Sequence, residues 1–115
     1  MTLGEKQRLF NRLQTEFCAW MYAEMPGYEF TDGDAYRDHR VHGAPGEKKA
    51  YGAPNSKHKQ RLARDYNLFI NGVYQETTEA HRPLGEKWES MHPLCRWGGN
   101  FRRPDGNHYE FRSDR

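Results

Sequence analysis

Apolar residues near the N-terminus recur at spacings of three and four, which is the pattern of an amphipathic helix. They are Leu9, Phe10, Leu13, Phe17, Trp20 and Met21. The pattern predicts a helix over about residues 3–25, and Pro26 with Gly27 would end it. We expect the apolar stripe of this helix to pack on the core.

Residues 62–70 alternate between the two faces of an extended chain and are rich in β-branched or aromatic side chains, which predicts a strand. The pair Asn71-Gly72 follows directly and is the preferred sequence of a two-residue type I′ turn. We therefore expect a β-hairpin whose second strand contains Val73 and Tyr74.

Three further elements complete the predicted fold. Residues 81–91 are typical of a short helix, with Pro83 near its first turn, and residues 108–111 are typical of a strand. A short strand over residues 28–30 precedes a loop of about 30 residues, a length that is uncommon unless the loop is functional. The order of elements predicts an α+β fold, with a small antiparallel sheet and flanking helices.

Composition supports one folded domain over residues 1–115. Only 35% of the residues are hydrophobic and 30% are charged, yet three Trp, seven Tyr and six Phe are spread along the chain, unlike in disordered segments.

The net charge of +2 is low for a protein that binds nucleic acid. With only Cys18 and Cys95, and no CxxC pair, we expect reduced thiols rather than a disulfide framework.

The lengths of the apolar runs indicate whether the chain could enter a membrane or carry a signal peptide. None reaches the roughly 20 residues of a membrane span, so we expect no membrane insertion. The N-terminus also lacks the apolar core of a signal peptide. We expect synthesis in the cytosol, so any target outside the membrane would be reached with help.

Histidines and carboxylates gather at two places in the sequence. Asp65 lies in a partly apolar row of the predicted strand, where a carboxylate needs a partner such as a metal ion or an arginine, and His58 in the preceding loop could converge on it. Asp105 precedes His108 across a tight turn, and Glu110 shares a strand face with His108. Two histidines and one carboxylate are the ligands of catalytic zinc sites that keep a position open for water.

Other interpretations of these residues stay open at this point. His58 could be a surface loop residue and Asp105 only a turn former. His39 and His42 could form a metal site with Asp38. The histidines beside small basic clusters could also belong to a metal-dependent nuclease or a nucleic-acid binding module, although the aromatic residues are not interleaved with basic ones as a stacking platform requires.

Three sequence blocks resemble the zinc-dependent murein peptidases, which include D-alanyl-D-alanine carboxypeptidases and dipeptidases and the L-alanyl-D-glutamate endopeptidases of phage endolysins. The first block runs from Ser56 through His58 and Ala63 to Asp65, in the pattern SxHxxGxAxD. The second is Trp97-Gly98-Gly99, and the third is Asp105-x-x-His108-Tyr109-Glu110. With Tyr36-Arg37 ahead of them, the blocks span about residues 36–111 in the family's order.

The resemblance implies a hedgehog/DD-peptidase-like fold and a role for each matching residue. His58, Asp65 and His108 would hold Zn²⁺, and Asp105 would be the general base. Arg37 would contact the substrate and steady the oxyanion. Residues implied to bind substrate or to support the ligands are Tyr36, Ser56, Trp97 and Glu110.

The implied substrate is the peptide stem of bacterial peptidoglycan. Asp105 stands where carboxypeptidases of the family usually carry glutamate and endolysin-type endopeptidases carry aspartate, so the resemblance favours the L-alanyl-D-glutamate bond over D-alanyl-D-alanine. We expect a monomeric phage endolysin, released from the host cytosol by a holin-type partner. An inactive binding domain on the same scaffold is an alternative, but every catalytic position is filled.

Arg61 departs from the pattern, because the family usually has glycine at this position. We therefore expect a backbone at residue 61 that does not depend on positive φ.

Overall fold

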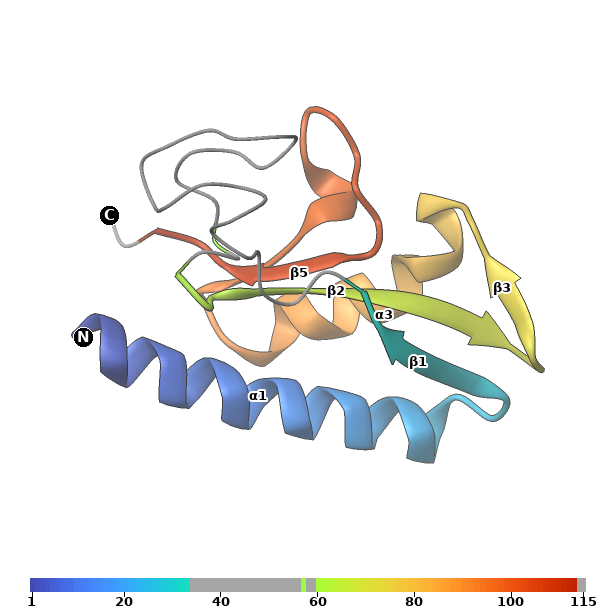
Figure 1. Cartoon of the computed structure of the whole chain (residues 1–115), viewed down its shortest axis with the longest axis horizontal. Coiled ribbons are helices and arrows are strands. Elements are labelled where there is room, and N and C mark those ends of the chain that lie inside the picture. The colour runs from blue at the N-terminus through green and yellow to red at the C-terminus, as the bar shows by residue number, and fades with distance from the viewer. Residues whose placement is uncertain (34–56, 58–59, 114–115) are drawn as a thin grey trace, which may run out of the picture.

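The structure, a computed structural model, describes residues 1–33, 57 and 60–113. The fold is α+β, as predicted, with two α-helices and a five-stranded sheet in this part of the chain (Figure 1). The helices are α1 (Leu3–Glu24) and α3 (Thr78–Met91), and a 3₁₀ turn covers Gly98–Asn100. The strands are β1 (Tyr28–Asp32), β2 (Ala63–Ile70), β3 (Val73–Gln75), β4 (Cys95–Trp97) and β5 (His108–Phe111).

Strand β2 is the centre of the sheet. The strand order is β1-β2-β5-β4, β3 also pairs with β2, and every pairing among the described strands is antiparallel. The hairpin between β2 and β3 turns at Asn71 and Gly72, whose φ angles of 50° and 78° are both positive. This is the backbone that a type I′ turn requires, so the predicted hairpin is confirmed.

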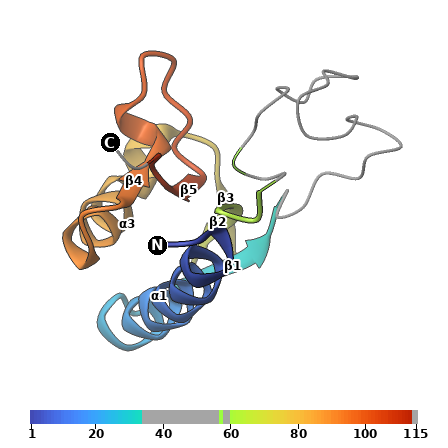
Figure 2. The ribbon, with the colours of Figure 1, turned by 90° about the vertical axis from the view of Figure 1, so that its left-hand side faces the viewer.

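The N-terminal helix begins with a capping box and buries the predicted stripe. Thr2 accepts a hydrogen bond from the backbone N–H of Glu5, and the Glu5 carboxylate accepts one from the backbone N–H of Thr2. Phe10 and Phe17 then pack against Trp88 of α3. The two helices therefore share one aromatic core. Figures 1 and 2 show how their ribbons lie relative to the strands.

Alternation along β5 separates the core from the candidate site. Tyr109 and Phe111 point toward the helices, since their rings contact Phe17 and Phe10 respectively. His108 and Glu110 must then face the opposite side of the sheet, because side chains alternate along a strand. In β5, Tyr109 and Phe111 therefore pack in the core, and His108 and Glu110 lie on the face of the candidate site.

Several boundaries differ from the predicted ones. Helix α3 begins at Thr78 rather than residue 81, because Thr77 accepts a hydrogen bond from the N–H of Ala80 and caps it there, so Pro83 lies inside the helix. Strand β1 is two residues longer than predicted. Strand β4 was not predicted, because three residues are too short to show a pattern.

The expectation for Arg61 is wrong, because its φ is +60°. The chain has at this position a left-handed backbone, which glycine adopts readily and an arginine does not.

The thiols of Cys18 and Cys95 are both free, but only Cys95 is buried, whereas Cys18 is half-buried. Neither described helix has the length and apolar character that a membrane crossing demands.

Candidate metal centre and adjoining cavities

Strand pairing places Asp65 directly opposite His108. In the β2–β5 ladder these two residues are register partners, and Ala63 is the partner of Glu110. Directly opposed side chains on one face of an antiparallel pair lie within contact distance. Asp65 and His108 are both 8% exposed, so their polar atoms meet in a largely water-free space.

The imidazole of His108 lies between two carboxylates. Its Nδ1 is 3.0 Å from Oδ1 of Asp65, and its Nε2 is 2.8 Å from Oε1 of Glu110. Burial by itself lowers the pKa of His108, but the hydrogen bonds and negative charges of both carboxylates outweigh it and raise the pKa to about 9. A positive charge between the two carboxylates is therefore favourable, and the protonated imidazole of His108 supplies it when no metal is bound.

Asp105 reaches the same place from the turn before β5. The backbone N–H of Asp105 donates to the carbonyl of Gly98, and the Asp105 carbonyl accepts from the N–H of His108. A Cβ on Gly98 would collide with the Asp105 carbonyl oxygen, so glycine permits this close approach. The turn is also held from the core side, where Trp97 Nε1 donates to the carbonyl of Gly106 over 2.7 Å.

Together, Asp65, Asp105 and His108 form a group that fits a divalent metal. One ligand atom from each lies within 4.8 Å of the other two. Carboxylate oxygen and imidazole nitrogen are both zinc ligands. Glu110 behind His108 gives the carboxylate–histidine arrangement that orients zinc-binding imidazoles, with Nε2 on the carboxylate and Nδ1 turned toward Asp65. A metal ion would replace the imidazolium as the positive charge of the group.

The structure therefore brings together two of the three predicted ligands, the predicted base and the predicted support, Glu110. Trp97 is fully buried, and its described polar contacts include the hydrogen bond that supports the turn at Gly106. The remaining predicted residues, His58, Ser56, Tyr36 and Arg37, lie outside the described residues. Asp38, His39 and His42 of the alternative metal site lie there too.

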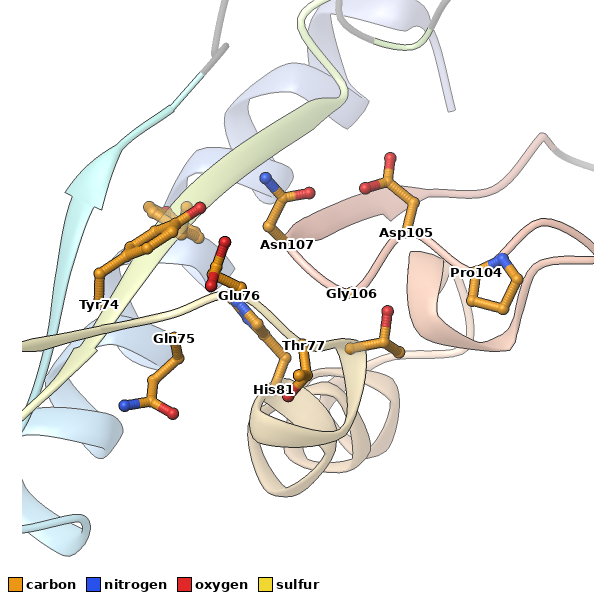
Figure 3. Close-up of a pocket in the computed structure, with 11 residues that line it drawn as sticks. Tyr74, Gln75, Glu76, Thr77, His81, Pro104, Asp105, Gly106 and Asn107 are labelled. Atoms are coloured by element: carbon orange, nitrogen blue, oxygen red, sulfur yellow. The ribbon is translucent and has the colours of Figure 1, made fainter.

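Two cavities lined by described residues adjoin the group. The first, of about 220 Å³, lies between the start of α3 and the turn at Asp105 (Figure 3). The second, of about 430 Å³, borders Glu110 and is lined by three basic residues, Lys57, Arg96 and Arg112. The first cavity thus contains the carboxylate of the predicted base, Asp105, and the second combines the carboxylate of the predicted support, Glu110, with three basic side chains.

Sequence reasoning missed His81 and Tyr109. His81 is the first residue of the helix predicted over residues 81–91, but α3 begins at Thr78, so His81 lies inside the helix, is 3% exposed and lines the first cavity. Its Nδ1 is 2.8 Å from the hydroxyl oxygen of Tyr109. Because α3 begins at Thr78, His81 lies in its first turn and its side chain is buried. Thr77, a residue type that commonly caps helices, was the sequence signal for this earlier start.

A family model matches the part of the chain that contains these residues. The model described as D-alanyl-D-alanine carboxypeptidase matches residues 50–111, just over half of the 115-residue chain, and the match contains Asp65, Asp105 and His108. A comparison with curated proteins found none that matches the chain.

Proposed function

This chain belongs to the D-alanyl-D-alanine carboxypeptidase family of zinc peptidases, which act on the peptide stems of peptidoglycan, and we propose that it is an endolysin-type enzyme that cuts the L-alanyl-D-glutamate bond. The observation that carries the proposal is the convergence of Asp65, His108 and Asp105 within 4.8 Å. Because the chain belongs to this family, it is a metallopeptidase. The family therefore does not support the nuclease that the sequence left open. The family also implies the hedgehog/DD-peptidase fold, with which the observed α+β architecture agrees.

Asp65 and His108 would hold the zinc ion together with His58, the third ligand in the family pattern. When bound, zinc supplies Lewis acidity and lowers the pKa of a coordinated water toward about 7. Glu110 keeps the His108 ring in place by accepting the Nε2 proton. Arg37 is proposed to steady the negative charge that develops on the scissile carbonyl oxygen.

Asp105 is the proposed general base. Its carboxylate is exposed, whereas Asp65 and His108 are buried, so it alone of the three reaches the side open to substrate. It would accept the proton of the attacking water and then pass that proton to the leaving amine. Proton transfer to the amine is what allows the peptide bond to break.

The choice of bond rests on the identity of this base. Aspartate at residue 105 follows the endolysin-type pattern, whereas the carboxypeptidases usually carry glutamate. A D-alanyl-D-alanine carboxypeptidase is therefore the alternative within the same family. The further proposal of a phage enzyme that a holin-type partner releases from the host cytosol depends on this same likeness to endolysins.

Digestion of purified peptidoglycan tests the proposal, with mass spectrometry of the soluble fragments. Cleavage as proposed exposes new amino groups on D-glutamate, whereas carboxypeptidase activity releases free D-alanine. A chelator should abolish the reaction and zinc should restore it. Release of D-alanine alone would select the alternative, and chelator-insensitive cleavage would contradict the metal-dependent mechanism.

A further inference from the structure

The cavity of about 220 Å³ beside Asp105 is lined by Tyr66 of β2 and by residues from two further parts of the chain. The segment from β3 into α3 contributes Tyr74, Glu76, Thr78 and His81, and the turn before β5 contributes Asp105 and Asn107 (Figure 3). Because Asp105 belongs both to this cavity and to the group that fits a metal, a molecule in the cavity would lie next to the reaction centre.

The charge of the cavity lining is negative. Glu76 and Asp105 contribute carboxylates, and the described residues that line the cavity include neither lysine nor arginine. Tyr74, which is 51% exposed, adds an aromatic ring at the same wall. Carboxylates and an aromatic face both attract cations. A carboxylate group of the substrate would be repelled here.

His81 gives the cavity a buried polar wall. The side chain extends from α3 toward Glu76, and its Nδ1 is occupied by the Tyr109 hydroxyl. No hydrogen-bond partner for its Nε2 is found among the described residues, although the residue is 97% buried (3% exposed). Burial lowers the pKa of His81 to about 4, so the ring is neutral at physiological pH and does not repel a cation.

We propose that this cavity is a subsite for a primary ammonium group of the peptidoglycan stem, the group carried by the side chain of the diamino acid that follows D-glutamate. The inference rests on the proposed function, because it assumes a stem peptide at the metal group. Glu76 is the specificity-determining residue of the subsite: its carboxylate pairs with the ammonium, and Tyr74 covers the alkyl chain. The stem's carboxylates are left to the basic cavity at Lys57, Arg96 and Arg112.

Calorimetric binding to the zinc-loaded protein tests the subsite without relying on turnover. The probes are N-acetyl-γ-D-glutamyl-L-lysine amide and the same peptide acetylated on the lysine side chain, neither of which contains the bond proposed for cleavage. We expect the free amine to bind about tenfold more tightly than its acetylated form, the effect of one charge-assisted contact. Glu76→Gln should remove this preference while leaving zinc binding unchanged.

Glu79→Gln is the matched control, because Glu79 lies three residues after Glu76, in the first turn of α3, and pairs with Arg82 outside the cavity. It should keep the wild-type preference. Equal affinity for the two peptides, binding of neither, or an unchanged preference in Glu76→Gln would overturn the subsite. Failure of the proposed function appears separately, as selective binding of the amine by a protein that releases no fragments from peptidoglycan.

Discussion

Glu110 holds the ring of His108 from the side away from Asp65, with 2.8 Å between Glu110 Oε1 and His108 Nε2. Both residues are on β5, two positions apart, so strand geometry alone places them on one face. The contact fixes which ring nitrogen is left for a metal. The carboxylate of Glu110 thus determines how the imidazole of His108 is presented to a metal.

Replacing Glu110 by glutamine should weaken zinc binding by about 10- to 100-fold, because the amide accepts the Nε2 proton without the negative charge that makes the imidazole a stronger ligand. Competition with a chromophoric chelator measures the affinity. Glu29→Gln, at an exposed position of β1, is the control and should bind zinc like the wild type. Wild-type affinity in Glu110→Gln would mean that Glu110 is not a support for the ligand.

Zinc binding should release a proton from His108. The pKa of about 9 means that the metal-free ring carries a proton at neutral pH, and a ligand nitrogen must lose it. Below about pH 9 the affinity for zinc should therefore rise with pH. Near pH 7 His108 should account for about one released proton per ion, beside the fraction released by a coordinated water with a pKa near about 7. Calorimetry in buffers of different ionisation enthalpy counts these protons. A count of zero at pH 7 would contradict a protonated His108.

The base and the ligand should respond differently to mutation. Asp105→Ala should leave zinc bound and reduce turnover by about 10²- to 10⁴-fold, the usual contribution of a general base. His108→Ala should lose both zinc and activity, since it removes a ligand. Metal content by atomic emission, measured beside peptidoglycan cleavage, separates the two outcomes. Full zinc occupancy in His108→Ala would count against its role as a ligand.

How far the sequence predicts the structure depends on the range of the interactions. The hairpin at Asn71-Gly72 and the strand containing His108 follow from local rules and were predicted closely. The register that sets Asp65 opposite His108 joins residues 43 positions apart, which no local pattern specifies. The ligand types of the two clusters and the family resemblance predicted that these residues meet, but not the strand pairing that brings them together. The inward position of His81 depends on where α3 begins, a boundary that one capping hydrogen bond decides.

Arg61 stands where the family usually has glycine, and its backbone is left-handed. Its φ of +60° costs a residue with a Cβ about 1 kcal/mol that glycine does not pay. Comparing Arg61→Gly with Arg61→Ala isolates this cost, because both variants lose the arginine side chain. We expect the glycine variant to have the larger free energy of unfolding, by about 1 kcal/mol in urea denaturation. A more stable alanine variant would mean that residue 61 does not have a left-handed backbone.

His81 should make the stability of the metal-free protein depend on pH. Its pKa is about 4 in the folded chain and about 6.5 when unfolded, so between these values the unfolded state binds more protons. Stability from the buried neutral ring is then complete above about pH 6.5 and is lost as the pH falls toward about 4. His108 has the opposite shift, so its contribution is lost only as the pH rises toward about 9.

The comparison variant is His81→Gln, because glutamine can still bond to the Tyr109 hydroxyl but does not titrate. On going from about pH 7 to about pH 5, the wild type should lose about 2 kcal/mol more unfolding free energy than the variant. Urea denaturation with a chelator present measures both proteins, and all other titrating groups cancel in the difference. Parallel pH profiles would mean that water reaches the ring freely, which would also remove the buried wall from the proposed ammonium subsite.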